Sequence, residues 1–220
     1  MKLAIYDFDG TLFNEETIPY LLDKWEDFGY STYARTTVRK KILKKYFFRK
    51  IKLLSKENFR TQATIDFLGI FDGMKREEIE DFFNKSSKNI NSFFNKKILT
   101  EIKKSSEEGY ENVMISGCFQ IMLNYALSDL PFKKIIGTKL PITDKGMNLN
   151  NDVEIISGLK KRDIIVKTFD GKLVDWEKSK AYGDSIYDRY VMKLTGHPTA
   201  VTPDGKLRSY AEKNKWDIIE

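Results

Sequence analysis

Short apolar runs alternate with longer amphipathic segments along most of the chain. Residues 3–8, LAIYDF, have the length and composition of a buried strand. Later runs resemble it, at 112–116, 134–137, 179–184, 199–201 and 217–219. The segments that follow them have apolar residues at helical spacing, at 119–127, 161–169, 186–194 and 206–213. Strands that alternate with helices in this way predict an α/β fold with a parallel sheet.

The first two predicted strands are separated by a long block with a different pattern. From about residue 16 to residue 94, apolar residues recur every three or four positions and no strand-like run interrupts them. We expect this block to form a helical cap inserted into the α/β core. The expected domains are a core and a cap, with residues 1–14 and 95–220 in the core and residues 15–94 in the cap.

The core contains one stretch with turn signals instead of helical spacing. Asp144-Lys145-Gly146 and Asn150-Asn151 lie within residues 139–157, and such residues favour tight turns. This stretch is therefore predicted to form a hairpin.

The composition is that of a globular protein, with 41% hydrophobic and 32% charged residues. No apolar run approaches the roughly 20 residues that span a bilayer, and no signal-peptide pattern follows Met1. Cys118 is the single cysteine, which excludes an internal disulfide framework. We therefore expect a cytoplasmic location.

The positive charge is concentrated in one segment, residues 35–56. The chain has a net charge of +6, and ten basic residues but no acidic one lie between Asp27 and Glu57. The predicted helix here has Val38, Ile42, Leu43, Tyr46 and Phe47 on one face, with the basic residues opposite.

This basic segment has several interpretations. It can be a solvated helix face, or it can attract an anionic substrate, an anionic membrane or a nucleic acid. We favour a solvated or substrate-steering face, with at most weak contact to anionic surfaces and no nucleic-acid partner, because no lipid-anchoring motif accompanies the segment.

Polar residues follow three of the predicted strands at the edge where open α/β sheets bind ligands. Asp7, Asp9 and Thr11 follow the first strand, and Ser116-Gly117 closes the second. The strand at 179–184 ends in Gly183-Asp184, and Asp188 comes one helical turn later. Two adjacent lysines, Lys160 and Lys161, open the helix before that strand.

These residues resemble the four motifs of the haloacid dehalogenase superfamily. The first motif, Asp-x-Asp-x-Thr, is matched at residues 7–11, and the second, a serine that closes a strand, is matched by Ser116. The third is a lysine that opens a helix, and Lys161 matches it better than Lys160. The fourth, Gly-Asp-x-x-x-Asp, is matched at residues 183–188. The resemblance implies a Rossmann-like parallel sheet core with an inserted helical cap. It also implies a hydrolase in which Asp7 is transiently phosphorylated.

The roles that the resemblance implies agree with elementary chemistry. Side chains two apart on an extended segment point the same way, so Asp7 and Asp9 can face one phosphate. Mg²⁺ takes oxygen ligands, here the Asp7 and Asp184 carboxylates, the Asp9 carbonyl and Asp188. Asp9 would be the general acid and then the base. Thr11, Ser116, Gly117 and Lys161 would bind the phosphate.

Within the superfamily the chain looks most like the phosphoserine phosphatase group. Asn14–Ile18 resembles the segment that follows the nucleophile there, and Glu16 stands where that group places a carboxylate for the substrate ammonium. Counting along the cap as in the family arrives at Asp66 where an arginine would grip the substrate carboxylate. The leading hypothesis is therefore an Mg²⁺-dependent phosphomonoesterase of a small phosphorylated metabolite.

Two other functions stay open from the sequence. The substrate could be a phosphorylated lipid or headgroup, approached through the basic helix. Alternatively, the protein could be a binding module on a hydrolase fold that has lost catalysis, but Asp7, Asp9, Ser116, Asp184 and Asp188 are all present.

Overall fold

The computed structural model describes residues 1–149 and 153–220 and, for Lys56 and Glu57, the backbone alone. The chain folds into two compact units. The first, the core unit, comprises residues 1–16, 88–138 and 156–220, and the second, the cap unit, comprises residues 17–87 and 139–155.

The core unit is built on a six-stranded parallel sheet. Its strands are β1 (Lys2–Tyr6), β2 (Tyr110–Phe119), β3 (Phe132–Thr138), β6 (Lys180–Gly183), β7 (His197–Val201) and β8 (Asp217–Ile219). Their order is β3-β2-β1-β6-β7-β8, and each neighbouring pair is parallel. The predicted α/β fold with a parallel Rossmann-like sheet is confirmed.

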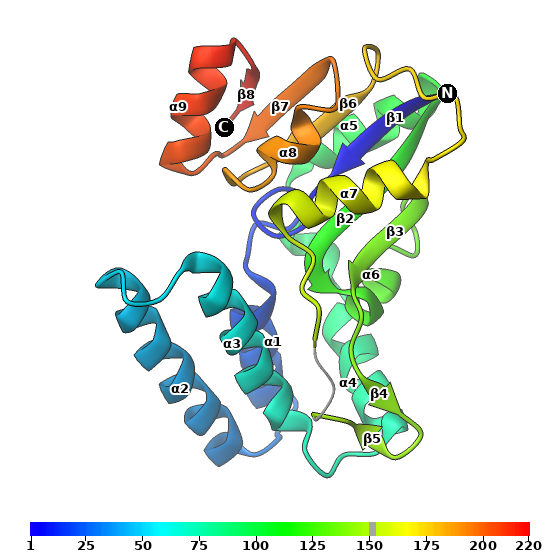
Figure 1. Cartoon of the computed structure of the whole chain (residues 1–220). Coiled ribbons are helices and arrows are strands. Elements are labelled where there is room, and N and C mark those ends of the chain that lie inside the picture. The colour runs from blue at the N-terminus through cyan, green and yellow to red at the C-terminus, as the bar shows by residue number, and fades with distance from the viewer. Residues whose placement is uncertain (150–152) are drawn as a thin grey trace. The chain divides into compact units, whose positions relative to one another are not determined.

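Helices cover both faces of this sheet. They are α5 (Lys96–Glu107), α6 (Gln120–Ala126), α7 (Gly158–Thr168), α8 (Arg189–Met192) and α9 (Gly205–Asn214). Figure 1 shows α7 and α8 on the side of the sheet that faces the viewer and α5 behind it. Between the sheet and the helices lies an apolar core that includes Leu3, Ile5, Val113 and Ile165, each no more than 1% exposed. β1 is buried on both faces, which explains why its sequence is a continuous apolar run.

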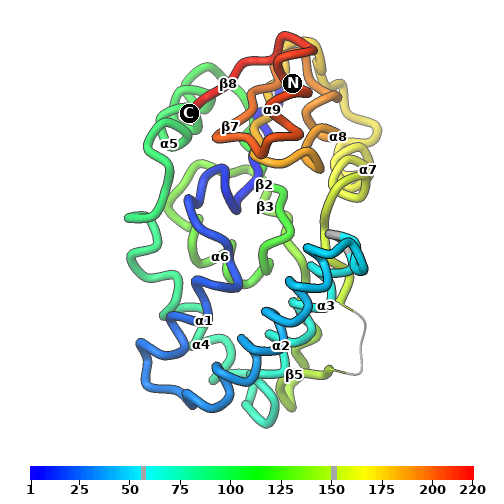
Figure 2. Tube along the Cα trace, turned by 90° about the vertical axis from the view of Figure 1, so that its left-hand side faces the viewer, coloured from blue at the N-terminus to red at the C-terminus, as the bar shows by residue number. Residues whose placement is uncertain are grey.

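The cap unit is mainly helical. It contains α1 (Thr17–Asp27), α2 (Thr32–Lys50), α3 (Lys56–Leu68), the 3₁₀ turn η1 (Gly69–Phe71) and α4 (Arg76–Ser87), and α2 lies alongside α3 (Figures 1 and 2). Its centre is aromatic, because the Phe71 and Phe82 rings pack edge to face against each other and both contact Trp25. The helical character predicted for this block is confirmed.

The apolar face predicted for α2 is only partly buried. Val38 is buried and Ile42 is half-buried, but the side chains of Leu43 and Phe47 are 56% and 59% exposed. An α-helix makes one turn in about 3.6 residues, so the neighbouring side chains of Ile42 and Leu43 point about 100° apart. The surface of α2 that packs against its neighbours is too narrow to bury both.

The predicted hairpin is present as β4 (Ile142–Thr143) and β5 (Gly146–Met147), with Asn150-Asn151 outside the described residues. It groups with the cap unit, whereas the sequence predicts that it belongs to the core. The guanidinium of Arg76 in α4 lies 3.3 Å from Asp144, and Gly146 packs so closely against Met74 that a Cβ would lie 2.0 Å from the Met74 carbonyl oxygen.

The other end of the predicted cap also differs. Residues 88–94, which include the 3₁₀ turn η2 (Ile90–Phe93), group with the core unit. Phe94 packs edge to face on Phe8, and Phe93 packs on Phe13. Within the described residues, no helix is both long enough and apolar enough to cross a membrane.

Candidate active site

Two neighbouring strands place two carboxylates side by side. β1 and β6 are paired through Tyr6 and Tyr182, and Asp7 and Asp184 follow at their carboxyl ends. β2 flanks β1 on the other side, with Met114 opposite Tyr6, and it carries Ser116 two residues further on. The order of the strands reverses here, since β2 and β6 lie on either side of β1, and such switch points are where open α/β sheets bind ligands.

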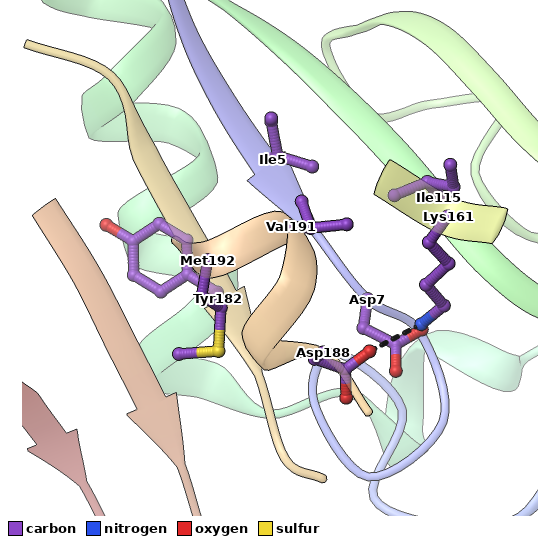
Figure 3. Close-up of a pocket in the computed structure, with 8 residues that line it drawn as sticks. All are labelled: Ile5, Asp7, Ile115, Lys161, Tyr182, Asp188, Val191 and Met192. Carbon is purple, nitrogen blue, oxygen red and sulfur yellow. Dashed lines mark hydrogen bonds and ion pairs between the residues drawn. The ribbon is translucent and has the colours of Figure 1, made fainter. Parts of the chain in front are cut away.

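A buried lysine joins two of the carboxylates. Lys161 extends from α7, and its Nζ atom lies 2.8 Å from Oδ1 of Asp7 and 2.7 Å from Oδ1 of Asp188 (Figure 3). Its side chain is only 6% exposed. Lys160 leaves the helix in another direction, because neighbouring helical residues are about 100° apart. Lys161 is therefore the lysine of the pair that reaches Asp7.

Asp188 is held on both of its oxygens. While Oδ1 contacts Lys161, Oδ2 accepts hydrogen bonds from the Ser185 hydroxyl at 2.7 Å and the Ser185 backbone N–H at 3.1 Å. Gly183 makes this approach possible, because a Cβ there would lie 2.5 Å from Cβ of Asp188. Both oxygens of Asp188 are thus engaged, by Lys161 and by Ser185, and Asp188 positions the lysine.

Asp184 occupies space that a glycine leaves open. Gly10 has a φ of +73°, a conformation that favours glycine, and a Cβ there would lie 2.6 Å from Oδ2 of Asp184. The turn after β1 can therefore pass directly over the Asp184 carboxylate only with glycine at position 10.

The electrostatics of the cluster are uneven. Burial raises the pKa of Asp184 to about 9, with further contributions from the charges of Asp188 and Asp7. Burial also raises the pKa of Asp7, and the opposing charge of Lys161 only partly offsets this. Burial would raise the pKa of Asp188 too, but Lys161 and the Ser185 donors outweigh it and hold that pKa below its usual value.

The three carboxylates fit a divalent cation. Oxygen atoms of Asp7, Asp184 and Asp188 all lie within 4.8 Å of one another. One lysine faces three carboxylates here, and the pKa of Asp184 is raised first by burial and then by the charges of Asp188 and Asp7. Hard oxygen donors with an excess of negative charge are what Mg²⁺ binds in proteins. The donor set therefore fits Mg²⁺, with Asp7 and Asp184 as its most available ligands.

The polar residues expected to bind phosphate lie in the same unit. Thr11 is fully buried, and its Oγ1 atom has no hydrogen-bond partner among the described residues. Ser116 is buried as well and accepts a hydrogen bond from the Cys118 backbone N–H at 3.2 Å. The Gly117 carbonyl accepts a hydrogen bond from the Thr138 hydroxyl at 2.9 Å, which ties the end of β2 to β3.

The other two candidate residues are more accessible. Asp9 is half-buried and its backbone forms a bridge with Phe13, which holds it in the turn directly after Asp7. Glu16 is exposed. Its charge makes a small contribution to the raised pKa of Asp184, so Glu16 lies near enough to the cluster for its charge to act there.

Two residues with a clear structural role were not among the candidates from the sequence. Gly10 admits the Asp184 carboxylate, and Ser185 orients Asp188. Gly10 carried a signal, since a glycine between Asp9 and Thr11 predicts an unusual backbone turn. The role of Ser185 had no signal, because its hydrogen bond depends on how the turn after β6 folds.

A family model for haloacid dehalogenase-like hydrolases matches residues 4–193, which include every candidate site residue. The chain belongs to this family. The chain is therefore a hydrolase by family, and the motif residues Asp7 and Asp184 lie at the ends of adjacent strands. No curated protein matches the sequence significantly.

Solved structures share the fold at low sequence identity. A protein of unknown function from Bordetella pertussis Tohama I has a TM-score of 0.83 at 16% identity, over 100% of this chain and 98% of that one. A HAD family hydrolase from Salmonella enterica serovar Typhi has a TM-score of 0.73 at 16% identity, over 99% of this chain and 66% of that one. A phosphoserine phosphatase in its apo form has a TM-score of 0.66 at 21% identity, over 99% and 92%.

Proposed function

We propose that this hydrolase is a phosphatase that removes phosphate from a small phosphorylated metabolite, with Asp7 as nucleophile. The observation that carries the proposal is the contact of Lys161 with both Asp7 and Asp188, next to Asp184. A carboxylate that attacks a phosphate monoester must approach another anion, and the barrier falls only where fixed positive charge balances the phosphoryl oxygens. Lys161 is a positive charge fixed at the nucleophile.

The hydrogen bonds of Asp7 suggest which oxygen attacks. Oδ1 accepts from the Phe8 backbone N–H at 2.7 Å and contacts Lys161. Within the described residues, both contacts go to Oδ1, and Oδ2 is left for the incoming phosphorus or a metal. Because two donors fix Oδ1, the carboxylate cannot rotate freely, and its orientation is set before substrate arrives.

Mg²⁺, when bound by Asp7 and Asp184, would supply further positive charge to the phosphoryl oxygens. Lys161 keeps its proton throughout the reaction. Burial alone would lower its pKa, but Asp188 and Asp7 outweigh this effect and hold the pKa above the usual value for lysine. It acts as a permanent cation and not as an acid.

Asp9 is proposed to move the proton. It donates a proton to the leaving alcohol and then accepts one from the water that hydrolyses the phosphorylated Asp7. The position of Asp9 in a turn, half-buried and two residues from Asp7, suits a group that must reach both substrate and water.

The substrate class is tested by hydrolysis of a panel of phosphorylated metabolites with Mg²⁺ present. We expect release of inorganic phosphate from at least one small monoester, and phosphoserine is included because a phosphoserine phosphatase shares the fold. The Asp7→Asn variant serves as the control, because an amide cannot attack phosphorus. Hydrolysis by Asp7→Asn at more than a few per cent of the wild-type rate would refute Asp7 as nucleophile.

A further inference from the structure

α2 and its C-terminal end carry a second apolar stripe, whose side chains are about half exposed. Leu43, Phe47 and Ile51 follow one another at intervals of four residues, so they lie one above the other on one side of the helix. Their exposed fractions are 56%, 59% and 48%. The stripe that packs inward is a different one and begins at Val38, which is 6% exposed. α2 is thus apolar on two sides, one of them in solvent.

The end of the helix extends this stripe by an ordered turn. Lys52 has a φ of +61°, and the backbone N–H groups of Lys52 and Leu53 donate to the carbonyls of Arg49 and Phe48, both at 3.0 Å. This pair of hydrogen bonds forms a Schellman motif, which closes helices in a fixed geometry. It holds Leu53 at the helix end with 73% of its surface exposed. We call Leu43, Phe47, Ile51 and Leu53 the apolar tip.

Lysines surround the apolar tip. Lys40, Lys41, Lys44, Lys50 and Lys52 are all exposed, and α2 contains no acidic residue. Arg35 and Lys45 form ion pairs, with Asp23 and Asp66 respectively. No carboxylate of the described part of the chain pairs with Lys40, Lys41 or Lys44. The charge around the tip is therefore positive and uncompensated.

We propose that the apolar tip and its lysines dock on the surface of a bilayer that contains anionic phospholipids. Aliphatic and aromatic side chains insert at the boundary between headgroups and acyl chains, while lysines contact the anionic headgroups around them. Charge complementarity favours this occupant. A second copy of the chain would bring the same lysines together. A nucleic acid would engage the lysines but would leave the aliphatic Leu43, Ile51 and Leu53 in water.

The sequence alone favours a solvated or substrate-steering face for the same segment. Either role needs charge alone, and neither explains an exposed stripe of Leu, Phe and Ile. The docking surface goes beyond the proposed phosphatase activity, since no residue of the apolar tip belongs to the cluster around Asp7. Peripheral docking of this kind needs no membrane-spanning helix.

The test is co-sedimentation of the full-length protein with vesicles of phosphatidylcholine plus phosphatidylserine, and with vesicles of phosphatidylcholine alone. Two variants probe the surface. The first is the double variant Leu43→Asn and Phe47→Asn, and the second is the triple variant Lys40→Glu, Lys41→Glu and Lys44→Glu. Two matched controls lie in the core unit. Leu173→Asn alters an apolar side chain that is 92% exposed, and Lys133→Glu with Lys134→Glu and Lys206→Glu reverses three other exposed lysines.

We expect the wild type to bind vesicles that contain phosphatidylserine, and both α2 variants to bind at least about tenfold more weakly, since each basic side chain and each inserted apolar side chain contributes separately. Both controls should bind like the wild type. Asp7→Asn should also bind normally, so that failure of docking and failure of the phosphatase proposal are distinguishable. All substituted α2 side chains are exposed, and circular dichroism confirms that each variant is folded.

Four outcomes would overturn the proposal. The wild type could fail to bind at low ionic strength, or it could bind with no sensitivity to the Leu43 and Phe47 substitutions, which would indicate charge attraction without insertion. Binding to duplex DNA as tight as binding to the vesicles would point to a nucleic acid. A dimer that forms in solution and dissociates on substitution of Leu43 and Phe47, without vesicle binding, would mean that a second copy covers the tip.

Discussion

The Nζ atom of Lys161 lies 2.8 Å from Oδ1 of Asp7, and the lysine side chain is almost completely buried. A charge pair inside a protein loses its hydration, so it is stable only where each charge keeps a partner. Lys161 has two partners, since Asp188 is 2.7 Å away. The arrangement holds a cation at the proposed nucleophile.

Removal of this cation should affect both activity and stability. Lys161→Met should lower kcat/KM by at least about a hundredfold, which is typical for loss of one group that stabilises a transition-state charge. It should also lower the free energy of unfolding of the metal-free protein by about 3–5 kcal/mol, because Asp7 and Asp188 lose their counter-ion. Steady-state kinetics and urea unfolding measure the two effects.

Lys160→Met is the matched control, since it changes the adjacent side chain of the same helix. It should leave the activity close to that of the wild type, because Lys161 and not Lys160 makes the contacts with Asp7 and Asp188. The Nζ atom of Lys160 is itself buried, so circular dichroism checks that this variant is folded. A large loss of activity in Lys160→Met, with little change in Lys161→Met, would mean that the phosphate lysine is the other member of the pair.

The crowded carboxylates predict an opposite effect on stability for Asp184. Burial, Asp188 and Asp7 raise the pKa of Asp184 to about 9, so at neutral pH the metal-free protein must take up a proton at this carboxyl when it folds, which lowers its stability. Asp184→Asn removes this cost, so the metal-free protein should become more stable by about 1 kcal/mol or more, equivalent to roughly 2–4 °C in Tm. The same substitution should abolish both activity and the increase in Tm that Mg²⁺ produces in the wild type. Thermal unfolding with chelator and with Mg²⁺ measures these effects. An unchanged Mg²⁺ response in Asp184→Asn would remove Asp184 from the proposed metal site.

Metal dependence follows from the same cluster. Wild-type activity should disappear with excess chelator and return with Mg²⁺, whereas Ca²⁺ should inhibit. Ca²⁺ accepts more ligands at longer distances, so it would let Asp7 bind through both oxygens and would misalign the attack. Full activity in excess chelator would contradict the proposed metal site.

Asp9→Asn should slow the reaction in a way that depends on the leaving group. An alkyl phosphate needs its leaving alcohol protonated, but an activated aryl phosphate needs little protonation. We therefore expect Asp9→Asn to lower the rate of the phosphorylation step at least about tenfold more for the alkyl ester than for the aryl ester. Pre-steady-state measurements of ester cleavage give the two rates. Equal losses for both esters would show that Asp9 is not the general acid.

Ser185 is expected to act through Asp188 and Lys161 and not on the substrate. Ser185→Ala removes the hydroxyl donor to Oδ2 of Asp188 but keeps the backbone N–H donor. A hydrogen bond to a charged group contributes about 1.5–3 kcal/mol, so kcat should fall by roughly tenfold or more while KM changes little. Ser185→Thr, which keeps the hydroxyl, should restore most of the activity. A rise in KM with unchanged kcat would mean that Ser185 contacts substrate instead.

The sequence alone determined the type of sheet and the residues that lie at its strand ends. The alternation of buried strands and amphipathic helices predicted the parallel sheet, because a strand buried on both faces must be apolar throughout. The position of Asp7, Ser116 and Asp184 at strand ends was enough to predict that they gather at one edge, since parallel strands end together there. The roles assigned to them remain predictions.

Only the tertiary structure decided which of two adjacent side chains on a helix points toward the site or the protein interior. The sequence favours Lys161 over the adjacent Lys160 only through a family resemblance, whereas the packing of α7 on the sheet directs Lys161 toward Asp7. Likewise, the sequence pattern placed Leu43 with Ile42 on one apolar face, whereas the contact of α2 with its neighbours leaves Leu43 in solvent. In both cases the physical reason is the same. Sequence spacing determines the angle between side chains on a helix, but the rotation of the helix about its own axis is set by the surface against which it packs.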